Sequence, residues 1–208
     1  MIMFTPSTPY VPGTYAKKRP EAGRVAAQYV QEWEARRQRL SQKKTAAPEI
    51  PPCICFSRKV GVGALEVADI LSRKLHMRVA DREILEHMSG ETRLDKGTVK
   101  FYDELYPGKT VEVSALLFGK TSFQMDDYLR NLVNAVYSIA AIGSTIFVGR
   151  GTHLILPRDR VLAVRLICSD GFRTERLASL LKIGAEEADD VVGDPPERRR
   201  RQCFQHRP

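Results

Sequence analysis

The chain has 208 residues, 43% of them hydrophobic, and its 33 lysines and arginines against 25 aspartates and glutamates give a formal net charge of +8. This length supports one core of moderate size with an appendage and excludes two large domains. The positive charge suits polyanionic partners such as nucleotides, nucleic acid or acidic surfaces, but much of it lies toward the two ends and does not choose among them.

The four cysteines do not form a disulfide framework in a chain of this length, and Cys53 and Cys55 would lie on one face of a strand as buried reduced thiols. The cysteines and histidines lack the spacing of zinc ligands, so we expect no metal site built by protein alone. No stretch is apolar for long enough to cross a bilayer, and the start lacks the pattern of a signal peptide. We expect a cytoplasmic protein without a membrane partner.

The first 52 residues predict an arm, a helix and a linker. Residues 1–19 are rich in Pro, Thr, Ser and Tyr without periodicity, which predicts a disordered arm. Residues 20–44 predict an amphipathic helix with a narrow apolar stripe, and the proline-containing residues 45–52 predict a linker. Trp33 lies on that stripe, and packing against the domain is favoured over a partner-binding helix.

Residues 53–88 predict strand, helix, strand and helix, in that order. A strand over 53–57 leads through a glycine-bearing turn to a helix over 64–75, and a strand over 78–80 leads to a helix over 82–88. Asp81 stands at the end of the second strand, where it can cap the following helix. This alternation is typical of a parallel α/β sheet.

The turn after the first strand predicts a phosphate-binding site. Gly61 and Gly63 would let the backbone approach an anion, and the following helix would present its unpaired N–H groups and the positive end of its dipole. The pattern GxxxxGK[ST] is not matched, because Ala64, Leu65 and Glu66 follow the last glycine. A tight turn without a ligand therefore remains the alternative interpretation.

The second half predicts more of the same sheet. A helix over 126–142 leads to a strand over 144–148, and a later strand over 161–168 leads to a helix capped by Ser169 or Asp170. The segment between residues 91 and 127 is less regular. Ligands of open parallel sheets bind at the carboxyl ends of strands, so we expect the turn after 148 and the phosphate turn to converge on one crevice.

The chain resembles the cytidylate kinase-like family of P-loop nucleoside monophosphate kinases in four segments: FSRKVGVGALEVADILSRKL, RVADREIL, GSTIFVGRGTHLIL and RVLAVRLICSDGFRTERL. The resemblance implies a three-layer P-loop NTPase-like α/β domain over 53–208, with a lid at about 185–203. It also implies phosphoryl transfer from ATP to a nucleoside monophosphate such as CMP, with Mg²⁺. Because RRRRQCFQHRP has no strand pattern, we expect the last strand of the sheet to be missing.

The resemblance implies three groups of site residues. The donor phosphates would be held by Ser57, Arg58, Lys59, Gly61, Val62, Gly63 and Ala64, although Val62 and Ala64 stand where relatives often have serine and glycine. The acceptor would be bound by Asp81, Arg82, Gly149, Arg150 and Gly151, with Arg150 clamping its phosphate and Asp81 beside the acceptor or near the metal through water. Catalytic charge would come from Arg150, Arg173 and Arg198.

Each assignment has an alternative. Asp81 could serve only as a helix cap, Arg173 and Arg176 could be solvated, and the run Arg198–Arg201 could be a disordered basic tail. Two other functions stay open: a catalytically weakened nucleotide-binding or regulatory module of the same fold, and a basic nucleic-acid-binding protein, which we consider the less favoured. A second subunit could cover the open edge of the sheet, so a homo-oligomer is possible.

Overall fold

The computed structural model describes residues 21–43, 50–90 and 125–193. The predicted arm, most of the linker, the irregular segment up to residue 124 and the end of the lid with Arg198 lie outside these residues. The chain divides into two compact units. The larger comprises Arg19–Arg58 and Gly63–Leu166, and the described part of the smaller comprises 59–62 and 167–193.

The larger unit contains a parallel sheet. Its strands are β1 (Cys53–Arg58), β2 (Arg78–Ala80), β3 (Thr145–Val148) and β4 (Val161–Leu166). They are ordered β2-β3-β1-β4, and every neighbouring pair is parallel. The predicted α/β class and parallel sheet are confirmed. All four carboxyl ends lie at one edge of the sheet, as a crevice for a ligand requires.

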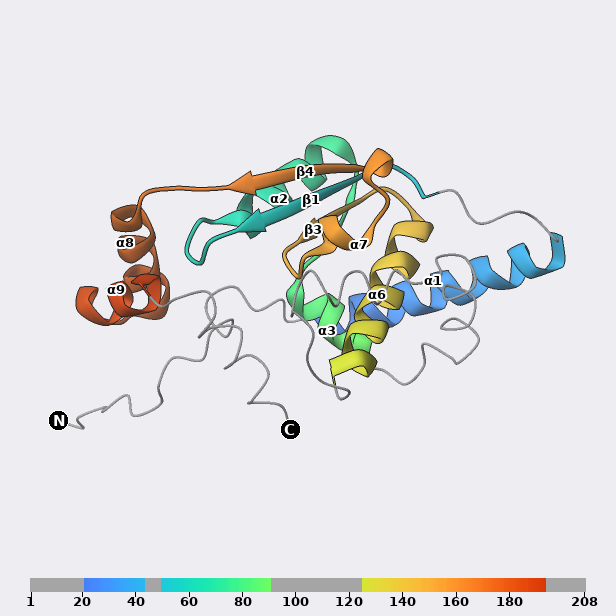
Figure 1. Ribbon diagram of the computed structural model, residues 1–208, viewed down its shortest axis with the longest axis horizontal. Helices are drawn as coiled ribbons and strands as arrows, with labels where there is room; N and C mark the ends of the chain where they lie inside the picture. The colour runs from blue at the N-terminus through green and yellow to red at the C-terminus, as the bar shows by residue number, and fades with distance from the viewer. Residues whose placement is uncertain (1–20, 44–49, 91–124, 194–208) are drawn as a thin grey trace. The chain divides into compact units, whose positions relative to one another are not determined.

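Helices cover both faces of the sheet, which makes three layers (Figure 1). Side chains alternate along each strand, so Ile146 and Val148 pack with α2 (Ala64–Leu75), whereas Phe147 belongs to the opposite cluster. That cluster includes α1 (Ala22–Lys43), α3 (Arg82–Gly90) and α6 (Met125–Ile142). Each of these predicted amphipathic helices therefore packs its apolar side against one face of the sheet.

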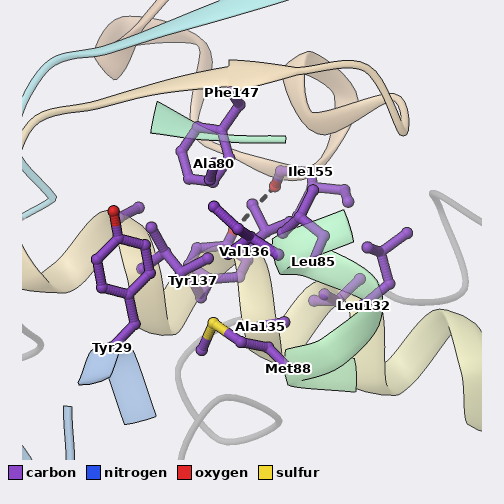
Figure 2. Close-up of a cluster of buried hydrophobic side chains, with 14 of the residues drawn as sticks. Tyr29, Ala80, Leu85, Met88, Leu132, Ala135, Val136, Tyr137, Phe147 and Ile155 are labelled. Atoms are coloured by element: carbon purple, nitrogen blue, oxygen red, sulfur yellow. Dashed lines mark hydrogen bonds between the residues drawn. The ribbon is translucent and has the colours of Figure 1, made fainter. Parts of the chain in front are cut away.

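The cluster opposite α2 forms the main core (Figure 2). Tyr137 of α6 buries its ring there and satisfies its hydroxyl by donating to the carbonyl oxygen of Ile155 at 3.0 Å. Ile155 belongs to α7 (Thr152–Ile155), the short helix after β3, which precedes the 3₁₀ turn η1 (Arg158–Arg160) and β4. The segment that links β3 to β4 is thus anchored from the core side.

The N-terminal helix α1 is part of this core. Trp33 has an exposed fraction of 0%, so the prediction that it packs on the domain is confirmed. Polar contacts add to this packing: Arg78 of β2 donates to Glu32 at 2.6 Å, and its guanidinium lies 5.4 Å from the centre of the Tyr29 ring. Helix α1 packs against α3 and α6.

Strand β4 forms an edge of the sheet within the described part of the chain. Leu162 at its start is 62% exposed, and Ala163 and Arg165 on the opposite face are also exposed. This exposure agrees with the expected open edge of the sheet. Helix α1 packs against the helices α3 and α6. Among the helices that the structure describes, none is long and apolar enough to cross a membrane.

The smaller unit contains α8 (Asp170–Leu181) and α9 (Ala185–Gly193). Its apolar cluster joins the two helices through Leu177, Ala188, Val191 and Val192, and Val60 of the turn after β1 packs against it. Helix α8 begins with a side-chain cap, because the hydroxyl of Ser169 accepts from the backbone N–H of Phe172 at 3.3 Å. The predicted cap is confirmed.

Candidate functional site

The carboxyl ends of β1 and β3 bring two predicted site segments together. Phe56 pairs with Val148, and the N–H of Gly149 donates to the carbonyl of Phe56 at 2.9 Å. Arg58 ends β1, and its guanidinium lies against Gly149: a Cβ added to this glycine would lie 2.2 Å from Nη1 of Arg58. Arg58, which was expected at the donor phosphates, therefore contacts the turn that was expected to bind the acceptor.

The turn after β3 has an unusual backbone. Gly149, Arg150 and Gly151 have φ values of 90°, 56° and 66°, so three successive residues lie in the left-handed region. This conformation costs a non-glycine residue about 1 kcal/mol or more, and such residues concentrate at functional sites. Thr152 stabilises the turn, because its hydroxyl and its N–H both donate to the carbonyl of Gly149, at 3.2 and 3.4 Å. The turn holds Arg150 at the carboxyl edge of the sheet.

Glu86 of α3 connects two of the predicted acceptor-binding arginines. Its Oε1 accepts from Nε of Arg82 at 2.9 Å and also from Nη2 of Arg150. The side chain of Arg150 is 16% exposed and that of Glu86 is 33% exposed, so the contacts are partly shielded from water. With Arg58 at the neighbouring strand end, this part of the sheet edge carries three guanidinium groups, and one carboxylate joins two of them. We call Arg58, Arg82, Glu86 and Arg150 the arginine cluster.

Asp81 serves as a helix cap. Its Oδ1 accepts from the N–H of Ile84 at 3.1 Å, and the residue is 3% exposed. The structure thus bears out the capping interpretation. Among the described residues, no group of three or more histidine, cysteine, aspartate or glutamate side chains is arranged to hold a metal ion. The donor set fits Mg²⁺ only if nucleotide phosphates and water supply most of the oxygen ligands.

The turn after β1 needs both of its glycines for its backbone conformation. Gly61 and Gly63 have φ values of 83° and 81°, and a side chain at either position would be strained. Ala64 is the first residue of α2, where its methyl group is tolerated. The ends of the turn, with Ser57, belong to the larger unit and its middle, Lys59–Val62, belongs to the smaller one. The predicted role of the whole turn in donor binding stays a prediction.

Arg173 in the smaller unit is buried, with an exposed fraction of 2%. Its Nη2 donates to Asp170, its Nη1 lies 3.5 Å from the carbonyl of Val60, and its Nε is buried without a hydrogen-bond partner. A Cβ added to Gly61 would lie 3.1 Å from Cβ of Arg173, so the turn packs directly on α8. The guanidinium also lowers the pKa of Asp170. The alternative that Arg173 is merely solvated is wrong.

A cavity of about 560 Å³ lies at the other edge of the sheet. Its lining includes Cys53 and Val161, which begin β1 and β4, and Ser144, which precedes β3. It is therefore at the amino ends of the strands, away from Arg150. Ligands of open parallel sheets bind at the opposite, carboxyl edge, so we do not assign the nucleotide to this cavity.

Two residues of the site were missing from the sequence-based prediction. Glu86 had one available signal, since it lies four residues after Arg82 and such pairs meet on a helix surface. For Thr152 the sequence offered no signal except its position directly after Gly151. The structure gathers Arg58, Arg82, Gly149, Arg150 and Gly151 in the larger unit, and Lys59, Gly61, Val62 and Arg173 in the smaller one.

The chain is similar to known proteins through a family model and through solved structures. A solved structure, described as an uncharacterized protein from Eubacterium ventriosum, aligns with a TM-score of 0.48 at 14% identity, covering 71% of this chain and 75% of that one. No curated protein matches the chain. The family model described as the cytidylate kinase-like family matches residues 53–208. Since this match spans the greater part of the chain, the protein belongs to the cytidylate kinase-like family, which indicates a nucleotide kinase-like function.

Proposed function

We propose that the protein transfers a phosphoryl group from ATP to a nucleoside monophosphate, with CMP as the first acceptor to test. The observation that carries this proposal is the arginine cluster, because it concentrates guanidinium groups at the carboxyl edge where ligands of such sheets bind. A planar guanidinium can bind two phosphate oxygens at once, which suits Arg150 to hold the acceptor. Arg58 and Arg82 would add positive charge beside it.

The donor would be ATP accompanied by Mg²⁺. Backbone N–H groups of the turn Lys59–Gly63 and the first turn of α2 would hold its phosphates, helped by Lys59. Mg²⁺ bound together with the nucleotide would supply positive charge against the charge that develops during transfer. Arg173 on α8 and Arg198 of the predicted lid would contribute positive charge. A cytoplasmic setting is part of this proposal, since Cys53 and Cys55 are buried free thiols.

A nucleotide-binding module without transfer activity is the second candidate. It is favoured by the pairing of Arg150 with Glu86. The residues Val62 and Ala64 of the phosphate turn, where the family resemblance implies serine and glycine, point the same way. Such a module would bind nucleotides without accelerating transfer.

The deciding experiment follows ADP release with ATP and Mg²⁺ across a panel of nucleoside monophosphates, with nucleotide-induced thermal shift on the same samples. Acceptor-dependent turnover that falls at least about tenfold in Arg150→Ala, as expected for loss of a charge-assisted contact, supports the kinase. Arg39→Ala is the matched control, because it removes an exposed arginine on α1. A thermal shift without turnover in the parent protein would reject transfer and favour the binding module.

A further inference from the structure

The carboxylate of Glu86 occupies a position between two cations that the proposed acceptor phosphate would also approach. Arg82 and Arg150 come from different elements, α3 and the turn after β3, yet both donate to the same oxygen of Glu86. A carboxylate and a phosphate present the same kind of acceptor oxygens to a guanidinium. Glu86 therefore resembles, in its contacts, an anionic ligand of Arg150.

The partial exposure of this pair makes exchange feasible. The side chain of Glu86 is 33% exposed and that of Arg82 is 25% exposed, so the carboxylate can leave without opening the core. A phosphate monoester carries a charge of about −1.5 to −2 near neutral pH and offers three oxygens, against one charge on the carboxylate. The phosphate is thus the stronger partner for the arginine cluster, but its binding must work against the pairing already present.

We infer that Glu86 is an affinity-determining residue that competes with the acceptor phosphate for Arg150. This inference rests on the proposed function, in which Arg150 holds that phosphate. The carboxylate keeps the two guanidinium groups paired when the site is empty, and it is displaced, or repels the phosphate, when an acceptor binds. Removing its charge makes acceptor binding tighter.

The opposite result follows if Glu86 only orients Arg150. In that case the loss of the carboxylate would leave Arg150 less well placed and acceptor binding would weaken. The direction of the change thus separates competition from orientation. A substitution that keeps the shape of the side chain gives the cleanest comparison, because the amide oxygen of glutamine can still accept from Arg82.

The experiment measures binding of CMP and of inorganic phosphate, without ATP, by isothermal titration calorimetry. Glu86→Gln is expected to lower both dissociation constants by about twofold to fivefold, the size expected for a partly exposed ion pair. Glu86→Ala should change them in the same direction, and thermal unfolding checks that both variants fold. Glu175→Gln, which removes an exposed carboxylate from α8, is the matched control and should leave both values unchanged.

A double substitution tests whether Glu86 acts through Arg150. In the Arg150→Ala background, Glu86→Gln should no longer tighten binding, and persistence of the full effect would overturn the inference. Unchanged or weaker binding in Glu86→Gln, or no measurable binding of either probe, would overturn it as well. Tighter phosphate binding in a protein that transfers no phosphoryl group would support competition while rejecting the kinase. Phosphoryl transfer by the parent protein, together with unchanged dissociation constants in Glu86→Gln, would support the kinase and reject competition.

Discussion

Arg58 lies so close to Gly149 that a methyl group on the glycine would sit 2.2 Å from Nη1 of the arginine. Arg58 ends β1 and Gly149 directly follows the neighbouring strand β3, and the N–H of Gly149 continues the hydrogen bonding between the strands by donating to Phe56. Glycine at this position therefore serves two purposes: it allows a φ of 90° and it leaves space for a guanidinium at the sheet edge.

Gly149→Ala should lower both stability and acceptor affinity. The left-handed backbone alone costs alanine about 1–3 kcal/mol, and the new methyl group must also displace the Arg58 side chain. Urea unfolding measures the first effect and the KM for the acceptor measures the second. Gly171→Ala on α8 is the control, since an added Cβ there meets no atom within 4 Å. Parent-like stability of Gly149→Ala would contradict the described turn.

Arg58→Ala should affect the acceptor more than the donor. The guanidinium lies against the Gly149 turn, so its loss should raise the KM for the nucleoside monophosphate by about tenfold while changing the KM for ATP less. Steady-state kinetics with each substrate varied in turn separates the two constants. Lys59→Ala is the informative comparison and is expected to act mainly on ATP. Equal effects of Arg58→Ala on the two KM values would contradict the assignment of Arg58 to the acceptor.

Much of the fold could be predicted from local sequence. The strands at 53–58 and 145–148 are short apolar runs that end in glycine-bearing turns, and the intervening helices show clear apolar spacing. A capping role was predicted for Asp81, beside a possible ligand role, and for either Ser169 or Asp170, and the structure shows Asp81 and Ser169 as caps. These features depend on residues close together in the sequence, which is why pattern analysis succeeds for them.

The contacts within the site could not be predicted in the same way. Glu86 and Arg150 are separated by 64 positions, and the pair exists only because α3 and the turn after β3 reach the same edge of the sheet. Arg173 is similar: the sequence left solvation open as an alternative for it, whereas in the structure it is buried and the turn at Gly61 packs against it. Long-range packing, which leaves no local pattern, decides both cases.

Trp33→Ala should destabilise the protein strongly. Its side chain has no exposed surface, and truncation of such an aromatic costs about 3–5 kcal/mol, a large part of the 5–15 kcal/mol typical of a whole domain. Thermal and urea unfolding should show a large drop in stability. Gln31→Ala, at an exposed position of the same helix, should change it little. Similar stabilities for the two variants would mean that α1 does not belong to the core.

Cys55 should make the protein sensitive to alkaline pH. Burial raises the pKa of its thiol from the ordinary value of 9.0 to about 12, and burial also raises the pKa of Cys53. Because the folded-state pKa lies above the unfolded one, the contribution to stability is complete below pH 9.0 and is lost as the pH rises toward about 12.

The measurement is urea unfolding under reducing conditions at several pH values from neutral to about 10.5. The highest of these values lies between the pKa of Cys55 in the unfolded chain and its pKa in the folded protein. Cys55→Ala should start with lower stability, because a buried side chain is truncated, but should lose less of it as the pH rises. Cys168→Ala, at a partly exposed position, is the matched control and should keep the slope of the parent. An identical alkaline slope in Cys55→Ala and the parent would show that this thiol ionises as readily in the folded protein as in the unfolded chain.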